Sequence, residues 1–352
     1  MAGIKRVFDR STTGTSVAEI FSSAIRGKSI LITGINKGGL GGKMVEILSA
    51  HSPKMLILAS RTPSKIQDII EDSKSKSPST TYVPIALDLG SQKSVREAAA
   101  SILSNAQIQQ IDIVFNNAAV MSIPERQLSP EGIEMQFATN HIGHFLLTNL
   151  IMPKILAAAK SNVKGTTRII NVSSRGVAYG PVRFSDINFD KANESLPEAE
   201  QPGYEALAQT GRAVDPKDTY NPQTAYGQAK TANVLFSLAL TSRLYEKYGI
   251  LSFGLHPGAI LTELSRHLDQ EEFAKVTEKF KSMFVSVDQG CATSLRAGLD
   301  DSLGPANYKT DGQGIYLADA NIAEPPAWAH DPKLADRLWE LSEKLVGQKF
   351  DV

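Results

Sequence analysis

The sequence is poor in the residues that disulfide bonds and zinc sites require. Cys291 is its only cysteine, so no disulfide can form within the chain, and its six histidines show no zinc-site spacing. Lys plus Arg and Asp plus Glu both total 37, so no net charge favours binding to nucleic acid or to an anionic membrane. We therefore expect no metal, no nucleic-acid partner and a reducing compartment.

Long hydrophobic runs are also missing. The longest ones, such as residues 145–147 and 155–159, fall far short of the roughly 18 residues that a membrane-spanning helix needs. The N-terminus lacks the apolar core of a signal peptide, and neither end shows a targeting signal. These absences predict a cytoplasmic protein without a membrane span.

The apolar residues that are present follow a clear rhythm. They make up 42% of the 352 residues, against 21% charged, which is ordinary for a folded globular protein. Short runs that are apolar on both faces alternate with helical stretches, as in a parallel sheet covered on both sides. The pattern predicts an α/β fold with a Rossmann-type, doubly wound parallel sheet of about seven strands. The expected strands are residues 29–33, 55–59, 82–86, 111–115, 168–172, 251–255 and 314–317.

The sequence predicts one domain with an N-terminal leader. In the leader, residues 1–27, Ser16 and Glu19 have capping-box spacing, so we expect a short helix there that packs on the body. Residues 28–261 should form the dinucleotide-binding and catalytic core, and 262–352 should complete the same domain with substrate-lid elements.

Two stretches interrupt this rhythm. Residues 181–222 are rich in Asp, Glu, Pro and Gly and are expected to form a long loop or a partly ordered insertion. Residues 262–284 are amphipathic and charged, which fits a helical lid and a plain surface helix equally well.

A glycine-rich turn, Thr-Gly-Ile-Asn-Lys-Gly-Gly-Leu-Gly-Gly at residues 33–42, links the first strand to a helical stretch. Glycines let the backbone approach a pyrophosphate closely, and the N-terminus of the next helix offers unpaired N–H groups. The turn therefore predicts a dinucleotide-phosphate site, although a purely structural tight turn has the same pattern. The residues expected to bind there are Gly34, Lys37, Gly38, Gly39, Leu40 and Gly41.

The end of the second strand predicts which cofactor binds. Ser60 is followed by Arg61, about twenty residues past the glycines, where NAD-binding proteins usually carry an acid for the ribose 2′-hydroxyl. A basic residue instead favours the 2′-phosphate of NADP, with Lys37 as a second positive charge; a solvated loop residue is the alternative for Arg61. Asp88 and Leu89, after the third strand, should meet the adenine, although Asp88 serves equally well as a helix cap.

Tyr226 and Lys230 lie one helical turn apart on a predicted helix. A phenol, whose ordinary pKa is about 10, works as a base at neutral pH only beside a positive charge. Lys230 is the natural cation. The same spacing is common on ordinary helices, so the pair gains weight only from its surroundings.

Those surroundings are polar residues near the ends of neighbouring strands. Asn-Asn-Ala-Ala at residues 116–119 ends the fourth strand and Ser174 the fifth, at the edge where doubly wound proteins bind ligands. Asn140 lies in the next helix. His141 and His144 lie beside it, but no third ligand accompanies them, so packing is favoured over a metal or general-base role.

Together the glycine turn, residues 116–119, Asn-Val-Ser-Ser at 171–174 and Tyr-Gly-Gln-Ala-Lys at 226–230 resemble the short-chain dehydrogenases/reductases over roughly residues 27–260. The sequence around Asn140 and after Tyr226 is most similar to the retinol-dehydrogenase branch and its fungal relatives. The resemblance implies that Tyr226 is the general acid/base, while Lys230 lowers its pKa and holds the nicotinamide ribose. Ser174 would bind the substrate oxygen, and Asn140 would hold a water that relays protons to Lys230. The further cofactor-binding residues that it implies are Asn117, Ala118, Ala119, Pro257, Gly258 and Thr262.

Three departures from the family pattern matter. The glycine turn has one residue too many, which leaves Gly38 and Gly39 as alternatives for the close approach to the pyrophosphate. Ala119 replaces the usual glycine. Ser174 and Tyr226 are 52 residues apart, far more than usual, so the extra segment should shape the substrate pocket.

The sequence thus predicts an NADP(H)-dependent oxidoreductase that interconverts an alcohol and a carbonyl on an apolar or polyketide-like small molecule, most readily as a carbonyl reductase. One alternative is a non-catalytic NADP-binding sensor or assembly subunit, which loss of a catalytic residue would indicate. Another is an epimerase or dehydratase of similar length. A homodimer through the helices that carry Asn140 and Tyr226 stays open.

Overall fold

A single eight-stranded sheet runs through the computed structural model, which describes residues 7–211, 213–265, 277–278, 281–305, 309, 312 and 314–352. The strand order is β3-β2-β1-β4-β5-β6-β7-β8, and all neighbours pair in parallel except β7 and β8. This confirms the predicted doubly wound α/β fold. The strands are β1 (Ser29–Thr33), β2 (Met55–Ser60), β3 (Thr81–Ala86), β4 (Ile113–Asn116), β5 (Thr167–Val172), β6 (Ile250–His256), β7 (Tyr316–Ala318) and β8 (Asn321–Ile322).

The predicted strands differ from the observed ones mainly at one edge of the sheet. The last predicted strand was placed at residues 314–317, but Gly314 has a φ of +85°, outside the strand region, and β7 begins two residues later. The two residues of β8 are both exposed, so no apolar run indicates them. The central strands β1, β4 and β5 are buried at every position, as the continuous apolar runs predicted.

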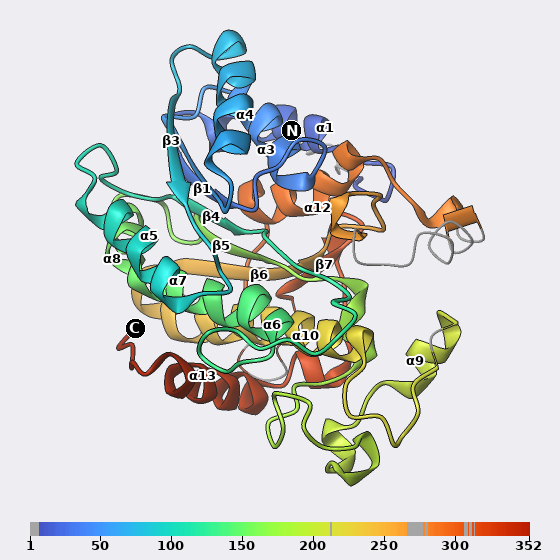
Figure 1. The fold of residues 1–352 in the computed structure, drawn as a ribbon. Helices are drawn as coiled ribbons and strands as arrows, with labels where there is room; N and C mark the ends of the chain where they lie inside the picture. The colour runs from blue at the N-terminus through green and yellow to red at the C-terminus, as the bar shows by residue number, and fades with distance from the viewer. Residues whose placement is uncertain are drawn as a thin grey trace.

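Helices cover both faces of the sheet. Figure 1 shows α3, α4 and α12 on one face and α5, α7 and α10 on the other. Among the described helices none alone is long and apolar enough to span a membrane; the bent pair Met135–Leu150 and Met152–Ala159 passes that test only when its two members are taken together. The helices are α1 (Gly14–Ile20), α2 (Ser22–Ile25), α3 (Leu40–Ser49), α4 (Pro63–Lys76), α5 (Gln92–Ser104), α6 (Met135–Phe137), α7 (Gly143–Leu150), α8 (Met152–Ala159), α9 (Tyr204–Gln209), α10 (Pro222–Tyr248), α12 (Val287–Leu299) and α13 (Pro332–Val346).

The N-terminal leader forms the expected short helix, α1, but the predicted cap is wrong. The side chain of Thr13 accepts a hydrogen bond from the backbone N–H of Ser16, so the helix begins before Ser16. The capping-box spacing that starts at Ser16 therefore lies inside the helix. Val17 and Ala18 bury the inner face of α1, which packs against α12.

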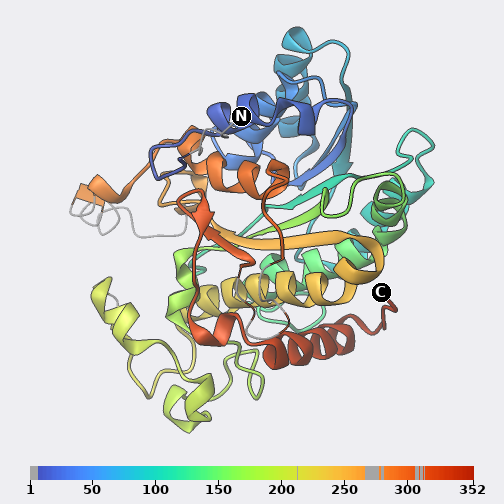
Figure 2. The same cartoon turned by 180° about the vertical axis from the view of Figure 1, so that it is seen from behind.

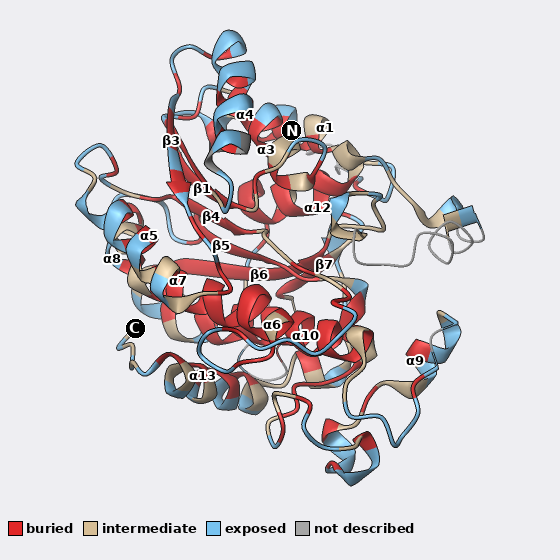
Figure 3. Cartoon of the chain, in the orientation of Figure 1, coloured by how far each residue is buried: buried red, intermediate tan, exposed pale blue. Residues whose placement is uncertain are grey.

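Helix α10 is the central element of the lower layer in Figure 1. The Asn221 side chain caps its N-terminus, and Gly249, at a φ of +71°, ends it. Figure 3 shows that most of α10 is buried, and Figure 2 shows α13 lying along it. Trp339 of α13 packs edge-on against Phe145 of α7, at 5.0 Å between ring centroids, and against Phe236 of α10.

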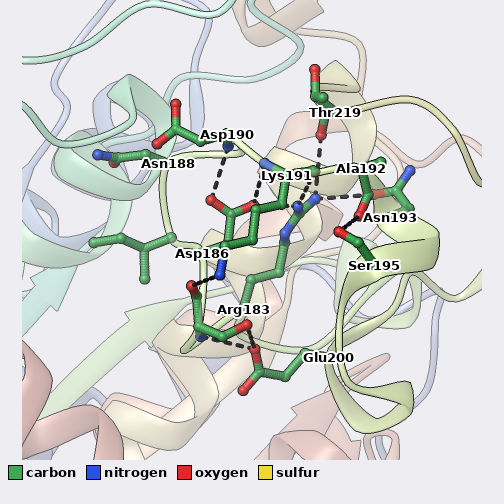
Figure 4. Close-up of polar contacts among 12 residues, drawn as sticks. Arg183, Asp186, Asn188, Asp190, Lys191, Ala192, Asn193, Ser195, Glu200 and Thr219 are labelled. Carbon is green, nitrogen blue, oxygen red and sulfur yellow. Dashed lines mark hydrogen bonds and ion pairs between the residues drawn. The ribbon is translucent and has the colours of Figure 1, made fainter.

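The insertion at residues 181–222 is organised by one buried arginine. Arg183 pairs with Asp186 and donates to the Lys191 carbonyl and the Asn193 side chain (Figure 4). Its guanidinium also stacks over the Phe189 ring at 4.2 Å. Buried charges that are paired and hydrogen-bonded to the backbone hold irregular segments in one conformation. The segment was expected to be a long loop or a partly ordered insertion; its described residues, 181–211 and 213–222, are irregular around Arg183 and include the short helix α9.

The segment at residues 262–284 was expected to be a lid or a surface helix. Most of it, residues 266–276 and 279–280, lies outside the described residues. Its described ends contain the 3₁₀ turns Glu263–Ser265 and Lys281–Met283. Residues 281–286 and α9 lie on the same side of the molecule in both views of the cartoon (Figures 1 and 2).

Candidate active site

The glycine turn closes tightly between β1 and α3. Gly34 has a φ of +77°, and a Cβ on it would lie 2.6 Å from the Ala118 Cα. A Cβ on Gly41 would collide with the Gly34 carbonyl, so neither position accepts a side chain. Gly39 is the N-cap of α3 and makes no side-chain cap, which leaves the first N–H groups of the helix available. This is a cradle that fits a phosphate of a dinucleotide.

The structure separates the two candidate glycines for the close approach. Gly39 is buried and lines the cleft in front of α3, together with Leu40. Gly38 is exposed, has open space around it and does not line the cleft. Lys37 is exposed and is also absent from the lining, so the structure does not bring it to the expected phosphate position.

The cleft has a volume of about 290 Å³ and lies at the ends of β1 to β4. The order of strands reverses between β1 and β4, which is where doubly wound folds bind nucleotides. Sequence reasoning missed several lining residues, although most of them adjoin predicted ones. The predicted residues that line the cleft are Gly34, Gly39, Leu40, Ser60, Arg61, Asp88, Leu89, Asn117, Ala118, Ala119 and Thr262. The missed ones are Ile35, Asn36, Ala59, Thr62, Leu87, Val120, Thr139, Glu263 and Leu264.

The contacts of Asp88 and Arg61, which both line the cleft, indicate their roles. Asp88 accepts a hydrogen bond from the Gly90 N–H, whereas Ser91 caps α5, so the helix-cap alternative for Asp88 is wrong. Arg61 is exposed at the cleft and forms no ion pair with any described residue. Its guanidinium is therefore available to an anionic ligand group.

Pro257 and Gly258, expected along the nicotinamide, lie in the loop after β6. They line a small separate cavity with Arg10 of the leader and do not line the main cleft. His256, the last residue of β6, accepts a hydrogen bond from the Arg175 N–H at 3.2 Å and so links the ends of β5 and β6.

Tyr226 and Ser174 meet at the end of β5. A hydrogen bond joins their side chains, and it opposes the burial that raises the pKa of Tyr226 above its usual value. Gly176 leaves room for the phenol, because a Cβ there would lie 2.9 Å from the Tyr226 ring. Ser174 and Tyr226 therefore lie together despite the 52-residue separation.

Lys230 is fully buried one turn along α10. Its ammonium donates to the Val172 carbonyl at 3.0 Å and lies 5.5 Å from the centre of the Tyr226 ring. Burial lowers the pKa of Lys230 to about 7. The sequence predicted that this lysine lowers the pKa of Tyr226, but in the structure burial raises that pKa and the group that opposes the rise is Ser174, not Lys230.

Asn140 lies in a π-helical turn, Ala138–Ile142, just before α7. Its side chain clamps the backbone of Val120: Nδ2 donates to the carbonyl at 2.9 Å and Oδ1 accepts from the N–H at 2.8 Å. The side chain thus positions the loop after β4. The expected role in holding a proton-relay water stays a prediction.

Comparisons with known proteins agree with this arrangement. A family model described as "short chain dehydrogenase" matches residues 28–185. The chain is 36% identical to short-chain dehydrogenase TIC 32 A, chloroplastic, of Brassica napus, covering 94% of this chain and 93% of the relative. It is 33% identical to human retinol dehydrogenase 13, covering 92% and 86%. The structure of NADPH-bound carbonyl reductase from chicken fatty liver shares the fold, with a TM-score of 0.57 at 21% identity over 85% of this chain and 99% of that one.

Family membership places the observed contacts in a chemical context. It implies a nicotinamide cofactor, NAD(H) or NADP(H), and a small-molecule substrate. The glycine cradle and the available N–H groups at the start of α3 fit the phosphates of such a cofactor. The protein is an oxidoreductase that belongs to the short-chain dehydrogenase/reductase family.

Proposed function

We propose that the protein is an NADP(H)-dependent carbonyl reductase. The observation that carries the proposal is the buried phenol of Tyr226, hydrogen-bonded to Ser174 and followed one turn later by Lys230. These three side chains supply an acid, a donor to a carbonyl oxygen and a cation at the end of β5.

The chain's own groups supply a protonated donor. Burial raises the pKa of Tyr226, so the phenol stays protonated at neutral pH and gives its proton to the oxygen of a bound carbonyl. Ser174 donates a hydrogen bond to the same oxygen and stabilises the charge that develops there. The Val172 carbonyl holds Lys230 in place. In its protonated form Lys230 stabilises the phenolate that remains after the proton has been transferred. The bound nicotinamide supplies the hydride.

The preference for NADP(H) follows from Arg61. No acid follows β2 to bind a ribose 2′-hydroxyl, and the guanidinium lies at the cleft without an ion pair among the described residues. An apolar substrate is supported by the retinol dehydrogenases among the relatives, whose names indicate an apolar alcohol. A homodimer through the helices that carry Asn140 and Tyr226 stays a prediction; Trp339 of α13 packs on Phe145 of α7 and Phe236 of α10.

A panel of apolar and polyketide-like carbonyls, each offered with NADPH and with NADH, tests the proposal. We expect cofactor oxidation that depends on the carbonyl and is faster with NADPH. Tight NADPH binding without turnover of any carbonyl would favour a non-catalytic sensor. Equal or faster turnover with NADH would overturn the assignment of Arg61.

A further inference from the structure

Two buried histidines lie one turn apart beside the active site. His141 belongs to the π-helical turn that contains Asn140, and His144 to the first turn of α7. Burial lowers the pKa of His141 to about 3 and that of His144 to about 4, so both rings are neutral at neutral pH. A neutral imidazole has one N–H donor and one acceptor nitrogen, and its partners decide which nitrogen carries the proton.

The partners of His144 fix its tautomer. Its Nδ1 lies 3.0 Å from the Asn140 carbonyl, which can only accept, so Nδ1 carries the proton. Its Nε2 is then an acceptor, and the Thr33 hydroxyl, 2.9 Å away, donates to it. His144 thus joins the turn around Asn140 to the last residue of β1.

The chain of contacts continues into the cofactor cleft. The oxygen of Thr33 accepts from the backbone N–H groups of Asn117 and Ala118, both at 3.0 Å. These two residues line the cleft. The charge of Lys230 is close enough to lower the pKa of His144, although no hydrogen bond joins the two residues.

His141 makes quite different contacts. Ser342 Oγ of α13 donates to the Leu338 carbonyl, so it accepts from His141 Nε2 at 2.8 Å. Nδ1 of His141 has no partner among the described residues. The ring packs against Phe137 and Phe236, away from the cleft. His141 therefore has the expected packing role. For this reason His141 also serves as a matched control.

We propose that His144 is a positioning residue of the active site. In its Nδ1–H form it holds the Asn140 carbonyl and directs the Thr33 hydroxyl, which in turn fixes the Asn117–Ala118 wall of the cleft. The proposal rests on the proposed function for its effect on turnover and for the choice of NADPH as the probe. Its effect on cofactor binding is independent of catalysis.

Isosteric substitutions test the two ends of the contact. His144→Asn keeps a donor near the Nδ1 position but removes the acceptor for Thr33, and Thr33→Val removes the hydroxyl without changing its shape. We expect each change to weaken NADPH binding about tenfold, and the double variant to be no weaker than either single one, because both break one chain of contacts. Thr33→Ser keeps the hydroxyl and should therefore bind NADPH like the wild type.

His141→Asn is the control for general damage to the core. It should lower the thermal unfolding temperature as much as His144→Asn while leaving NADPH affinity and kcat unchanged. Histidine ¹⁵N NMR of the wild-type protein should show His144 with the proton on Nδ1 and His141 with the proton on Nε2.

Three results would overturn the proposal: unchanged NADPH affinity in His144→Asn, additive losses in the double variant, or an Nε2–H tautomer for His144. If neither the wild type nor any variant reduces a carbonyl, the proposed function fails. The NADPH affinities of the single and double variants at positions 33 and 144 still test the present proposal.

Discussion

The two ends of helix α10 differ in what burial does for the protein. Near the N-terminus burial surrounds Tyr226 and Lys230, and it shifts the pKa of both groups away from their usual values. Further along it surrounds Phe236, in the middle of the helix, which packs with Trp339, and towards the C-terminus the Arg243 guanidinium stacks on that indole at 4.5 Å. One end thus keeps groups that burial destabilises, and the other supplies apolar and aromatic contacts that stabilise the helix.

The difference shows how the fold stabilises a site whose buried charge is unfavourable to the free energy of folding. The ammonium of Lys230 loses its hydration and, among the residues that the structure describes, gains one carbonyl partner within hydrogen-bond distance, Val172. The aromatic contacts of α13 fix α10 on the sheet from the other side (Figure 2). We therefore expect changes at the catalytic end to affect activity or pH dependence, and changes at the aromatic end to affect stability.

Lys230→Met should give the largest effect. The folded pKa of Lys230 is about 7 and the ordinary value is 10.5, so between these pH values the unfolded chain binds more protons. Wild-type stability should therefore rise with pH in this window, by about 1.4 kcal/mol per pH unit relative to Lys230→Met. Urea unfolding of the cofactor-free protein from pH 7 to 10 measures this. Lys247→Met, an exposed lysine in the last turn of α10, should not change the slope.

Trp339→Ala probes the opposite end of α10. Truncating this buried indole should lower the free energy of unfolding by about 3–5 kcal/mol, because it leaves a cavity against Phe145 and Phe236. The kcat of the remaining folded enzyme should stay near wild type, and Trp339→Phe should recover most of the stability. A large fall in kcat at full folding would show that the two ends are not separable.

Ser174→Ala tests the hydroxyl at the catalytic end. Loss of a donor to the developing charge should reduce kcat by roughly 10²–10³-fold with little change in stability. Ser173→Ala is the neighbouring control, since its hydroxyl donates to the Lys230 carbonyl and not to the phenol. Steady-state kinetics beside thermal unfolding measures both. An equal loss of kcat in the two variants would argue for a disturbed strand end instead.

Arg61→Ala should give the smallest effect, and this effect should be limited to cofactor binding. Loss of a charge-assisted contact to the 2′-phosphate, about 1.5–3 kcal/mol, should raise the KM for NADPH roughly 10- to 100-fold and leave that for NADH unchanged. Lys37→Ala is the matched control, because this exposed lysine is absent from the cleft lining. A larger effect at Lys37 than at Arg61 would reverse the assignment.

Much of the fold was predictable because it rests on local patterns. Continuous apolar runs indicated β1 to β6, and the glycine turn indicated the cleft in front of α3. The spacing of Tyr226 and Lys230 indicated the buried pair on α10. The prediction failed where long-range contacts decide. Whether Gly38 or Gly39 faces the cleft depends on how α3 packs against β1.

The same limit explains the partners that sequence spacing did not reveal. The clamp of Asn140 on Val120 joins positions 20 residues apart, and the contact of His144 with Thr33 spans 111 residues. No sequence pattern indicated the role of Arg183 either, because this role follows from burial within the insertion. Such contacts arise only when the folded chain brings their residues together.

The central claim is that Tyr226 donates the proton in carbonyl reduction. Tyr226→Phe removes only the phenolic oxygen, and Tyr82→Phe removes a buried phenolic oxygen that donates to Ser49, far from the cleft. For a carbonyl that the wild type reduces, Tyr226→Phe should lower the single-turnover rate by at least about 10²-fold with NADPH affinity unchanged, while Tyr82→Phe reacts like the wild type. Wild-type turnover by Tyr226→Phe would contradict the account.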